Sequence, residues 1–276
     1  MTVQIVTDSG SDLPPDLAAA HGITVVPLQV LVDGNAYRDG VDLTPEQFYA
    51  QMRTAKKLPQ TSQPTPHDLL TAYGAAAERG PVVAVHLSSA LSGTWQTATM
   101  AARTVSADIK VFDSRTGSGG LGLLALRAAE LARAGATAAE IWAHLENWRA
   151  ESWTLVALNT LENAVKGGRV SPLAGMAAAV LGVKPIVQVT REGKVEPIDR
   201  VRGRARALER VLALAGESRS TWAGRRVAVA HGGCPEEGAA FARQVRERFN
   251  PGEVLELQIG ATVGTYSAEG AILFSF

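Results

Sequence analysis

The 276-residue sequence has one cysteine, no excess charge of either sign and no hydrophobic run long enough to span a membrane. Cys234 has no partner for an internal disulfide, and no charged and then apolar leader opens the chain, so a reducing cytoplasm is the expected compartment. Lysine plus arginine number 27, as do aspartate plus glutamate. This balance gives no reason to expect a nucleic-acid or acidic-membrane partner.

Signatures of common enzymes are also missing. The five histidines do not have metal-type spacing to one another or to Cys234, so no metal site is expected. The chain has no GK[ST] phosphate loop and no G-x-S-x-G elbow. Residues 117–122 (GSGGLG) have the spacing of a dinucleotide-binding motif, but the preceding strand is expected to end at Phe112, which lengthens the turn. We interpret them as a flexible helix entry that lines a ligand pocket.

Alternating β-rich and helical segments in the first half predict an α/β fold. The expected strands cover residues 3–7, 24–32, 82–87 and 109–112, and the expected helices cover 14–21, 44–54, 66–78, 94–105, 119–133 and 137–151. Residues 33–34 (Asp-Gly) indicate a hairpin turn. We place a domain boundary near Ala150.

The second half has a different pattern, which predicts an α+β domain with a mixed sheet. A turn at residues 191–194 joins two β-like runs. Further strands are expected at residues 153–158, 227–230, 254–259 and 271–274, with helices at 161–166, 172–181, 202–217 and 235–249. The prediction is therefore an N-terminal domain of residues 1–150 and a C-terminal domain of residues 151–276.

Two hydroxyl-rich segments, residues 61–66 (TSQPTP) and 88–94 (SSALSGT), each precede an expected helix. Unpaired amides at a helix start, with nearby hydroxyls, can bind a carboxylate or phosphate. Alternatively, Ser92 and Thr94 only cap their helix. Thr65 precedes a proline and can likewise serve only as a helix cap. Residues 61–62 are therefore the better ligand candidates.

Other polar residues have two interpretations each. Asp8 ends the first expected strand, where it can act in chemistry or cap a loop. His86 is expected in a strand core. Arg169 follows two glycines and can bind an anion or lie free on the surface. The arginine run at residues 200–210 is expected to be a solvated helix face, or otherwise a docking surface.

An ordered set of segments resembles the DegV proteins, the FakB-type fatty-acid-binding family. The segments are residues 6–13, 61–64, 87–94, 167–169, 184–186 and 264–265. They span nearly the whole chain. The resemblance implies a two-domain fold, with a three-layer α/β/α N-terminal domain, a mainly parallel sheet and an α+β C-terminal domain. It further implies one bound fatty acid, with its carboxylate at the domain interface.

The resemblance also implies roles for individual residues. Thr61 and Ser92 would hydrogen-bond the fatty-acid carboxylate, and Ser62, Gly93 and Thr94 would be their neighbours. The ligand would be a long-chain acid such as palmitate or oleate. No cofactor is expected.

Family members present the fatty acid to a separate ATP-dependent kinase, which makes an acyl phosphate for phospholipid synthesis. The resemblance therefore implies a carrier and not an enzyme, with ATP bound by the kinase, and Arg169 would serve phosphoryl transfer or kinase docking. The family often has a Gly-Thr-His-x-Gly-Pro-Gly segment where residues 264–270 read Gly-Thr-Tyr-Ser-Ala-Glu-Gly. Tyr266 can donate a hydrogen bond to the ligand, but it does not titrate near neutral pH as histidine does.

Two other classes of function compete with fatty-acid binding. One is a phosphotransferase or hydrolase for a small acidic substrate, using Asp8 or Ser92 with Arg169, although no base and nucleophile pair is evident. The other is a protein-interaction module that uses the basic run at residues 200–210.

Overall fold

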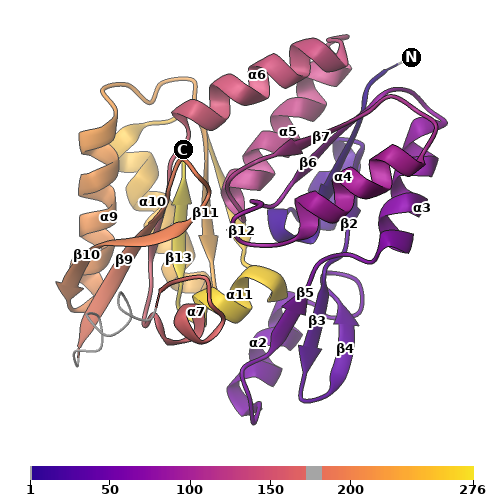
Figure 1. Ribbon diagram of the computed structural model, residues 1–276. Helices are drawn as coiled ribbons and strands as arrows, with labels where there is room; N and C mark the ends of the chain where they lie inside the picture. The colour runs from indigo at the N-terminus through magenta and orange to yellow at the C-terminus, as the bar shows by residue number, and fades with distance from the viewer. Residues whose placement is uncertain (1, 172–181) are drawn as a thin grey trace.

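The computed structural model describes residues 2–171 and 182–276 (Figure 1). Its N-terminal half contains a parallel sheet with the strand order β2-β1-β6-β7. The strands are β1 (Gln4–Asp8), β2 (Ile23–Val26), β6 (Val82–His86) and β7 (Ile109–Asp113). The helices of this half are α1 (Pro15–Ala20), α2 (Pro45–Thr54), α3 (Pro66–Ala77), α4 (Thr94–Thr104), α5 (Gly119–Arg133) and α6 (Ala138–Glu151).

Helices cover both faces of this sheet. Apolar side chains of α5 and α6 pack on one face, and those of α3 and α4 pack on the other. Strand β6 (VVAVH) is buried at every position, as expected for a parallel strand between two helical layers. The predicted three-layer α/β/α arrangement is confirmed.

The expected strand at residues 24–32 is wrong in one respect, because it is two strands in different sheets. The break falls at Pro27 and Leu28. Proline has no amide hydrogen and cannot continue a strand ladder. The second part, β3 (Gln29–Val32), pairs antiparallel with β4 (Asn35–Arg38) and with β5 (Gln60–Ser62) in a small separate sheet. The predicted hairpin turn at residues 33–34 joins β3 to β4.

The C-terminal half contains a six-stranded mixed sheet with the order β10-β9-β8-β13-β11-β12. The strands are β8 (Thr154–Ala157), β9 (Val183–Val189), β10 (Val195–Arg202), β11 (Arg226–His231), β12 (Glu253–Gln258) and β13 (Ile272–Ser275). The helices are α7 (Glu162–Lys166), α9 (Arg204–Ser218), α10 (Pro235–Phe249) and α11 (Ala261–Ser267). The mixed sheet was predicted. The helix expected at residues 172–181 lies outside the described residues.

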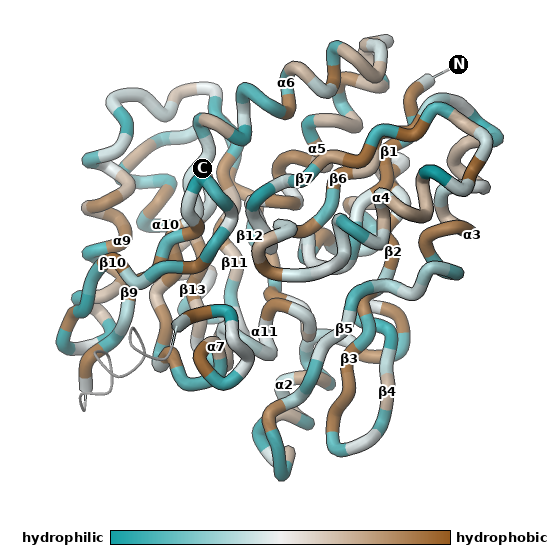
Figure 2. The backbone as a smooth tube through the Cα atoms, viewed as in Figure 1, coloured by the Kyte–Doolittle hydropathy of each residue, from teal (hydrophilic) through white to brown (hydrophobic). Residues whose placement is uncertain are grey.

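The two faces of the mixed sheet pack differently. Helices α9 and α10 cover the outer face with one apolar cluster. They alternate between apolar and polar segments, as helices with one buried face do (Figure 2). The inner face packs against α7 and against Leu123 of α5, and therefore faces the N-terminal half. The domain boundary near Ala150 stays a prediction.

Helix α11 was not predicted from the sequence. It lies in the centre of the molecule beside α2, α7 and β5, so that it contacts both halves (Figure 1). Its sequence, ATVGTYS, is poor in strong helix formers. No helix within residues 2–171 and 182–276 has the length and apolar character needed to cross a membrane.

Candidate functional site

An apolar cavity lies between the inner face of the six-stranded sheet and the loops that follow β2, β6 and β7. The six-stranded sheet contributes Val156, Leu158, Val187, Val189, Val195 and Leu273. The N-terminal half adds Leu28, Leu87 and Leu91. Loops at the carboxyl ends of parallel strands are where ligands bind in open α/β sheets. The walls suit an apolar ligand.

Four residues singled out in the sequence line this cavity together. They are Thr61 of β5, Ser92 of the loop between β6 and α4, Arg169 after α7, and Tyr266 of α11. They come from four elements that are far apart in the sequence. The fold therefore places hydroxyl groups and one guanidinium beside a largely apolar cavity.

Tyr266 is in contact with two of these residues. Its hydroxyl lies 2.7 Å from the Thr61 hydroxyl, and either group can donate that hydrogen bond. The Arg169 guanidinium carbon lies 4.2 Å from the centre of the Tyr266 ring, within the range of a cation–π contact. Arg169 also donates from Nε to the Leu91 carbonyl at 3.2 Å. These contacts join the two halves at the polar end of the cavity.

The glycine at position 167 is required by the same packing. A Cβ atom at Gly167 would lie 2.3 Å from Cε1 of Tyr266, far inside van der Waals contact. The Gly167 carbonyl accepts a hydrogen bond from Nη1 of Arg169 at 2.6 Å. The Gly-Gly-Arg segment therefore lets the tyrosine ring approach the chain and holds the arginine over that ring.

Ser92 lies at the entry of α4 but is not its N-cap residue, which is Gly93. The Ser92 hydroxyl lies 2.8 Å from the Thr94 hydroxyl and accepts from the Thr94 amide at 3.3 Å. Ser62, Gly93 and Thr94 do not line the cavity. Ser62 follows Thr61 in β5, so its side chain is on the opposite face of that strand. Their role as neighbours of the ligand stays a prediction.

Two buried aspartates that the sequence analysis did not assign to the site hold α11 in place. The carboxylate of Asp39 accepts from the amides of Ala261 and Thr262, both at 3.1 Å, and from the Thr262 hydroxyl at 2.5 Å. Asp12 accepts from the Gly260 amide at 2.9 Å. Asp12 belongs to the segment at residues 6–13, but nothing in the sequence shows that it reaches a helix about 250 residues later.

Burial changes the acidity of both aspartates. Loss of hydration disfavours the charged carboxylate and raises the pKa of Asp12 to about 8, although the hydrogen bond from the Gly260 amide opposes the shift. The pKa of Asp39 is also raised by burial, against hydrogen bonds from Thr262, Ser9 and Ala261. The Asp12 carboxyl supports the start of α11. Because its pKa is about 8, it keeps its proton at neutral pH.

Asp8 is part of a buried hydrogen-bonded chain and does not line the cavity. Its Oδ2 accepts from the Leu87 amide at 2.9 Å and lies 2.8 Å from Nδ1 of His86, whose Nε2 lies 2.8 Å from the Tyr73 hydroxyl. Its Oδ1 accepts from the Gly10 amide, which confirms the loop-capping interpretation. His86 is a core residue, as predicted.

The glycine-rich segment at residues 117–122 serves packing. Gly117 and Ser118 line the cavity, as predicted. A Cβ atom at Gly119 would lie 2.8 Å from that of Ala228, and one at Gly122 would lie 2.9 Å from the Ser11 carbonyl. These glycines let α5 lie close to the second sheet and to the first loop.

The arginine run at residues 200–210 does not form one helix face. Residues 200 and 202 belong to β10, and α9 begins at Arg204. Arg204 forms an ion pair with Glu237 at 2.6 Å, and Arg210 forms one with Asp199 at 2.7 Å. Two members of the run are therefore engaged within the fold.

A family model described as "Uncharacterised protein, DegV family" matches residues 2–276. The chain belongs to the DegV family. A DegV domain-containing protein of Deinococcus radiodurans is 37% identical over 274 residues, which cover 99% of this chain and 97% of that protein. The match extends along both halves, so the DegV relationship concerns the whole fold.

Solved DegV structures have the same fold. A DegV family protein from Thermus thermophilus, described by its fatty-acid binding, superimposes with a TM-score of 0.91 at 33% identity, covering 100% of this chain and 99% of that one. DegV from Bacillus subtilis, described as a fatty acid binding protein, gives a TM-score of 0.91 at 30% identity, covering 100% and 98%. The predicted DegV fold is confirmed.

Proposed function

We propose that this DegV protein binds one long-chain fatty acid, with the hydrocarbon tail in the apolar cavity and the carboxylate at its polar end. The observation that carries the proposal is the convergence of Thr61, Ser92, Arg169 and Tyr266 on one side of a cavity walled by leucine and valine. The fatty-acid binding described for similar DegV proteins supports it. In this proposal residues 1–150 and 151–276 are two domains, and the ligand lies between them.

The tail would supply most of the affinity. Burial of each methylene is worth about 0.8 kcal/mol, whereas a neutral hydrogen bond contributes nearer to about 1 kcal/mol net. We therefore expect chain length to change affinity more than the loss of either hydroxyl. Palmitate and oleate should bind far more tightly than short-chain acids.

The first test is organic extraction of the untreated protein, with mass spectrometry of the released lipid. About one fatty acid per chain is expected. In the delipidated protein, Thr61→Ala combined with Ser92→Ala should weaken palmitate binding by about one to two orders of magnitude, from two hydrogen bonds of about 1 kcal/mol each. Ser106→Ala is the control, because this serine is exposed and does not line the cavity. Equal affinity in the double variant and the parent would disprove the carboxylate position.

We further propose that the protein is a cytoplasmic carrier that presents the bound acid to a separate fatty-acid kinase, with Arg169 serving phosphoryl transfer or docking of the kinase. The position of this guanidinium beside the Tyr266 ring, at the polar end of the cavity, supports that role. The measurement is acyl phosphate formation from ATP and the loaded protein with a bacterial fatty-acid kinase. Absence of product with every kinase tried would limit the function to binding.

A further inference from the structure

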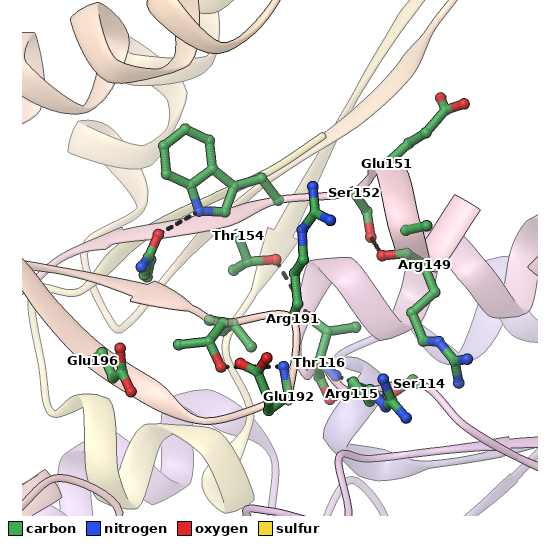
Figure 3. Close-up of a pocket in the computed structure, with 15 residues that line it drawn as sticks. Ser114, Arg115, Thr116, Arg149, Glu151, Ser152, Thr154, Arg191, Glu192 and Glu196 are labelled. Carbon is green, nitrogen blue, oxygen red and sulfur yellow. Dashed lines mark hydrogen bonds between the residues drawn. The ribbon is translucent and has the colours of Figure 1, made fainter. Parts of the chain in front are cut away.

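A second cavity, of about 520 Å³, lies between the end of α6, the start of β8, the loop after β7 and the turn between β9 and β10 (Figure 3). Its volume is in the range of small-molecule sites, roughly 300–1,000 Å³. It differs from the apolar cavity in its chemistry, because its lining is mostly charged and hydroxyl-bearing. Val189 lines both cavities.

Three guanidinium groups line this cavity, and each comes from a different element. Arg115 lies in the loop after β7, Arg149 in the last turn of α6, and Arg191 in the turn between β9 and β10. Figure 3 shows Arg115 and Arg149 near one another at one side, with Arg191 between them and the six-stranded sheet. Positive charge from both halves therefore lines the cavity.

Arg149 is held firmly in this arrangement. Its Nη1 donates to the Asp113 carbonyl at 2.8 Å, and its guanidinium carbon lies 4.6 Å from the centre of the Phe112 ring. Burial and the neighbouring charge of Arg115 lower the pKa of Arg149. The nearest carboxylate in an ion pair with it, Glu146, is 3.9 Å away. An anion in the cavity would relieve this repulsion between like charges.

The loop that carries Arg115 is also fixed. Arg115 has a φ of 52°, a left-handed conformation that is uncommon for this residue type, and its amide donates to Asp113 at 3.1 Å. The turn between β9 and β10 packs directly on this loop, since a Cβ atom at Gly193 would lie 2.9 Å from Cα of Arg115. Ser88 donates to the Gly193 carbonyl at 2.8 Å. Two of the three guanidiniums are thus attached to backbone segments that hold each other.

Three carboxylates also line the cavity, but two of them have other partners. Glu151 forms an ion pair with Arg225 at 3.2 Å and extends away from the guanidiniums in Figure 3. A hydrogen bond from the Thr190 hydroxyl lowers the pKa of Glu192, and the charges of Lys194 and Arg115 lower it further. Glu196 lies apart from the arginines, beside the strand (Figure 3). In the described part of the chain, no carboxylate lies within ion-pair distance of Arg115 or Arg191.

Several arginines elsewhere in the chain form ion pairs within the fold, whereas Arg115 and Arg191 have no carboxylate partner within ion-pair distance among the described residues. Arg204, Arg226 and Arg246 each form an ion pair with a glutamate at 2.7 Å or less. Guanidinium groups favour a multiply charged anion such as a phosphate, because their paired N–H groups match its oxygens. The buried hydroxyls of Thr116 and Thr154, 3.3 Å apart, add neutral hydrogen-bonding groups.

We propose that this cavity is a second ligand site, which binds a small phosphorylated molecule with two or more phosphate charges, such as a nucleoside diphosphate or pyrophosphate. The anion would contact Arg115 and Arg149 from the N-terminal half and Arg191 from the C-terminal half. It would therefore stabilise the packing of the two halves. This site is separate from the fatty-acid cavity, and its test does not depend on fatty-acid binding.

The test is calorimetric titration of the protein with pyrophosphate, ADP and ATP at constant ionic strength, together with the melting temperature. Saturable binding of one equivalent and a raised melting temperature are expected. Arg115→Gln combined with Arg191→Gln should weaken binding at least tenfold; both side chains are exposed, so folding should be retained. Arg79→Gln combined with Arg103→Gln, at two exposed arginines outside this cavity, is the charge-matched control.

Each result of the titrations has a different meaning for the proposed site. Pyrophosphate binding as tight as ADP binding would support the site and assign recognition to the phosphates alone. Tighter binding of the nucleotides would support it and show an additional contact with the nucleoside. Failure of all three probes to saturate, or an equal loss of affinity in the Arg79→Gln/Arg103→Gln control, would overturn the proposal. The melting temperature of the double variant without ligand, measured in parallel, checks that the fold is intact.

Discussion

The protonation state of Asp12 bears on the candidate site, because Asp12 contacts the start of α11, the helix that carries Tyr266. Asp12 is 8% exposed, and its carboxyl accepts from the Gly260 amide just before α11. Burial raises its pKa to about 8, from 3.8 for the unperturbed group. An ionised carboxylate at this position would be poorly solvated, so the folded state favours the protonated form.

We predict that the stability of the protein falls as pH rises from about 4 to about 8, in part because of Asp12. Over this interval the unfolded chain has released the Asp12 proton while the folded protein keeps it, so folding becomes less favourable by up to about 1.4 kcal/mol per pH unit from this group. Asp12→Asn cannot titrate and should remove this part of the slope. Denaturant unfolding at several pH values between 5 and 8 measures it. Asp108→Asn, an exposed control, should leave the slope unchanged; an unchanged slope in Asp12→Asn would contradict the assignment.

At the scale of the element, α11 depends on tertiary contacts. It has seven residues, two of them threonine and one glycine, and an isolated helix of this length does not form in water. Asp39 supplies acceptors for the first amides, and Asn163 of α7 donates to the Thr265 carbonyl at 3.0 Å. Because α11 carries Tyr266, these contacts also position one side of the cavity.

We expect Asp39→Ala to lower the free energy of unfolding by about 1–3 kcal/mol, since it leaves buried donors at the start of α11 without an acceptor. Palmitate affinity should fall as well, because Tyr266 loses its support. Thr137→Ala is the matched control: it removes the cap of α6, which does not line the apolar cavity, and should cost about 1 kcal/mol of stability without a change in affinity. Denaturant unfolding and palmitate titration measure both effects. If both variants bind palmitate as the parent does, the cap of α11 does not position the site.

At the scale of the whole molecule, the turn between β9 and β10 is a point where the two halves pack closely. Gly193 has a φ of 81°, and a Cβ atom there would lie 2.1 Å from the Ser88 hydroxyl and 2.9 Å from Cα of Arg115. The Ser88 hydroxyl is buried and donates to the Gly193 carbonyl. Any side chain at position 193 must therefore push the two halves apart.

Two glycine substitutions separate the cost of close packing at this turn from the cost of a positive φ. Gly193→Ala and Gly34→Ala both place a side chain at a positive φ, which costs about 1–2 kcal/mol. A Cβ atom at Gly34 would meet nothing within 4 Å, whereas one at Gly193 would collide with the opposite half. Thermal or denaturant unfolding should show a further loss of about 1–3 kcal/mol for Gly193→Ala alone. Equal losses in the two variants would mean that the halves do not pack closely at this turn.

The sequence alone determined most of the elements, because their signals are local. Alternation of β-rich and helical segments predicted the α/β and mixed-sheet halves. Helices were expected to start at residues 44 and 137, where Thr44 and Thr137 form capping boxes at the starts of α2 and α6. The ordered DegV-like segments selected Thr61, Ser92, Arg169 and Tyr266, which line one cavity. Caps and hydrophobic periodicity need only neighbouring residues, and such features can be detected in one sequence.

Only the tertiary structure decided what depends on distant contacts. Residues 24–32 divide between two sheets because Pro27 ends one ladder and β5, about 30 residues later, supplies a partner for the other. Helix α11 exists because buried carboxyls from Asp12 and Asp39 meet its amides across more than 200 residues of sequence. The grouping of Arg115, Arg149 and Arg191 likewise follows from how the two halves pack. Hydrogen bonds and charges act through space, and their partners are fixed only when the chain has folded.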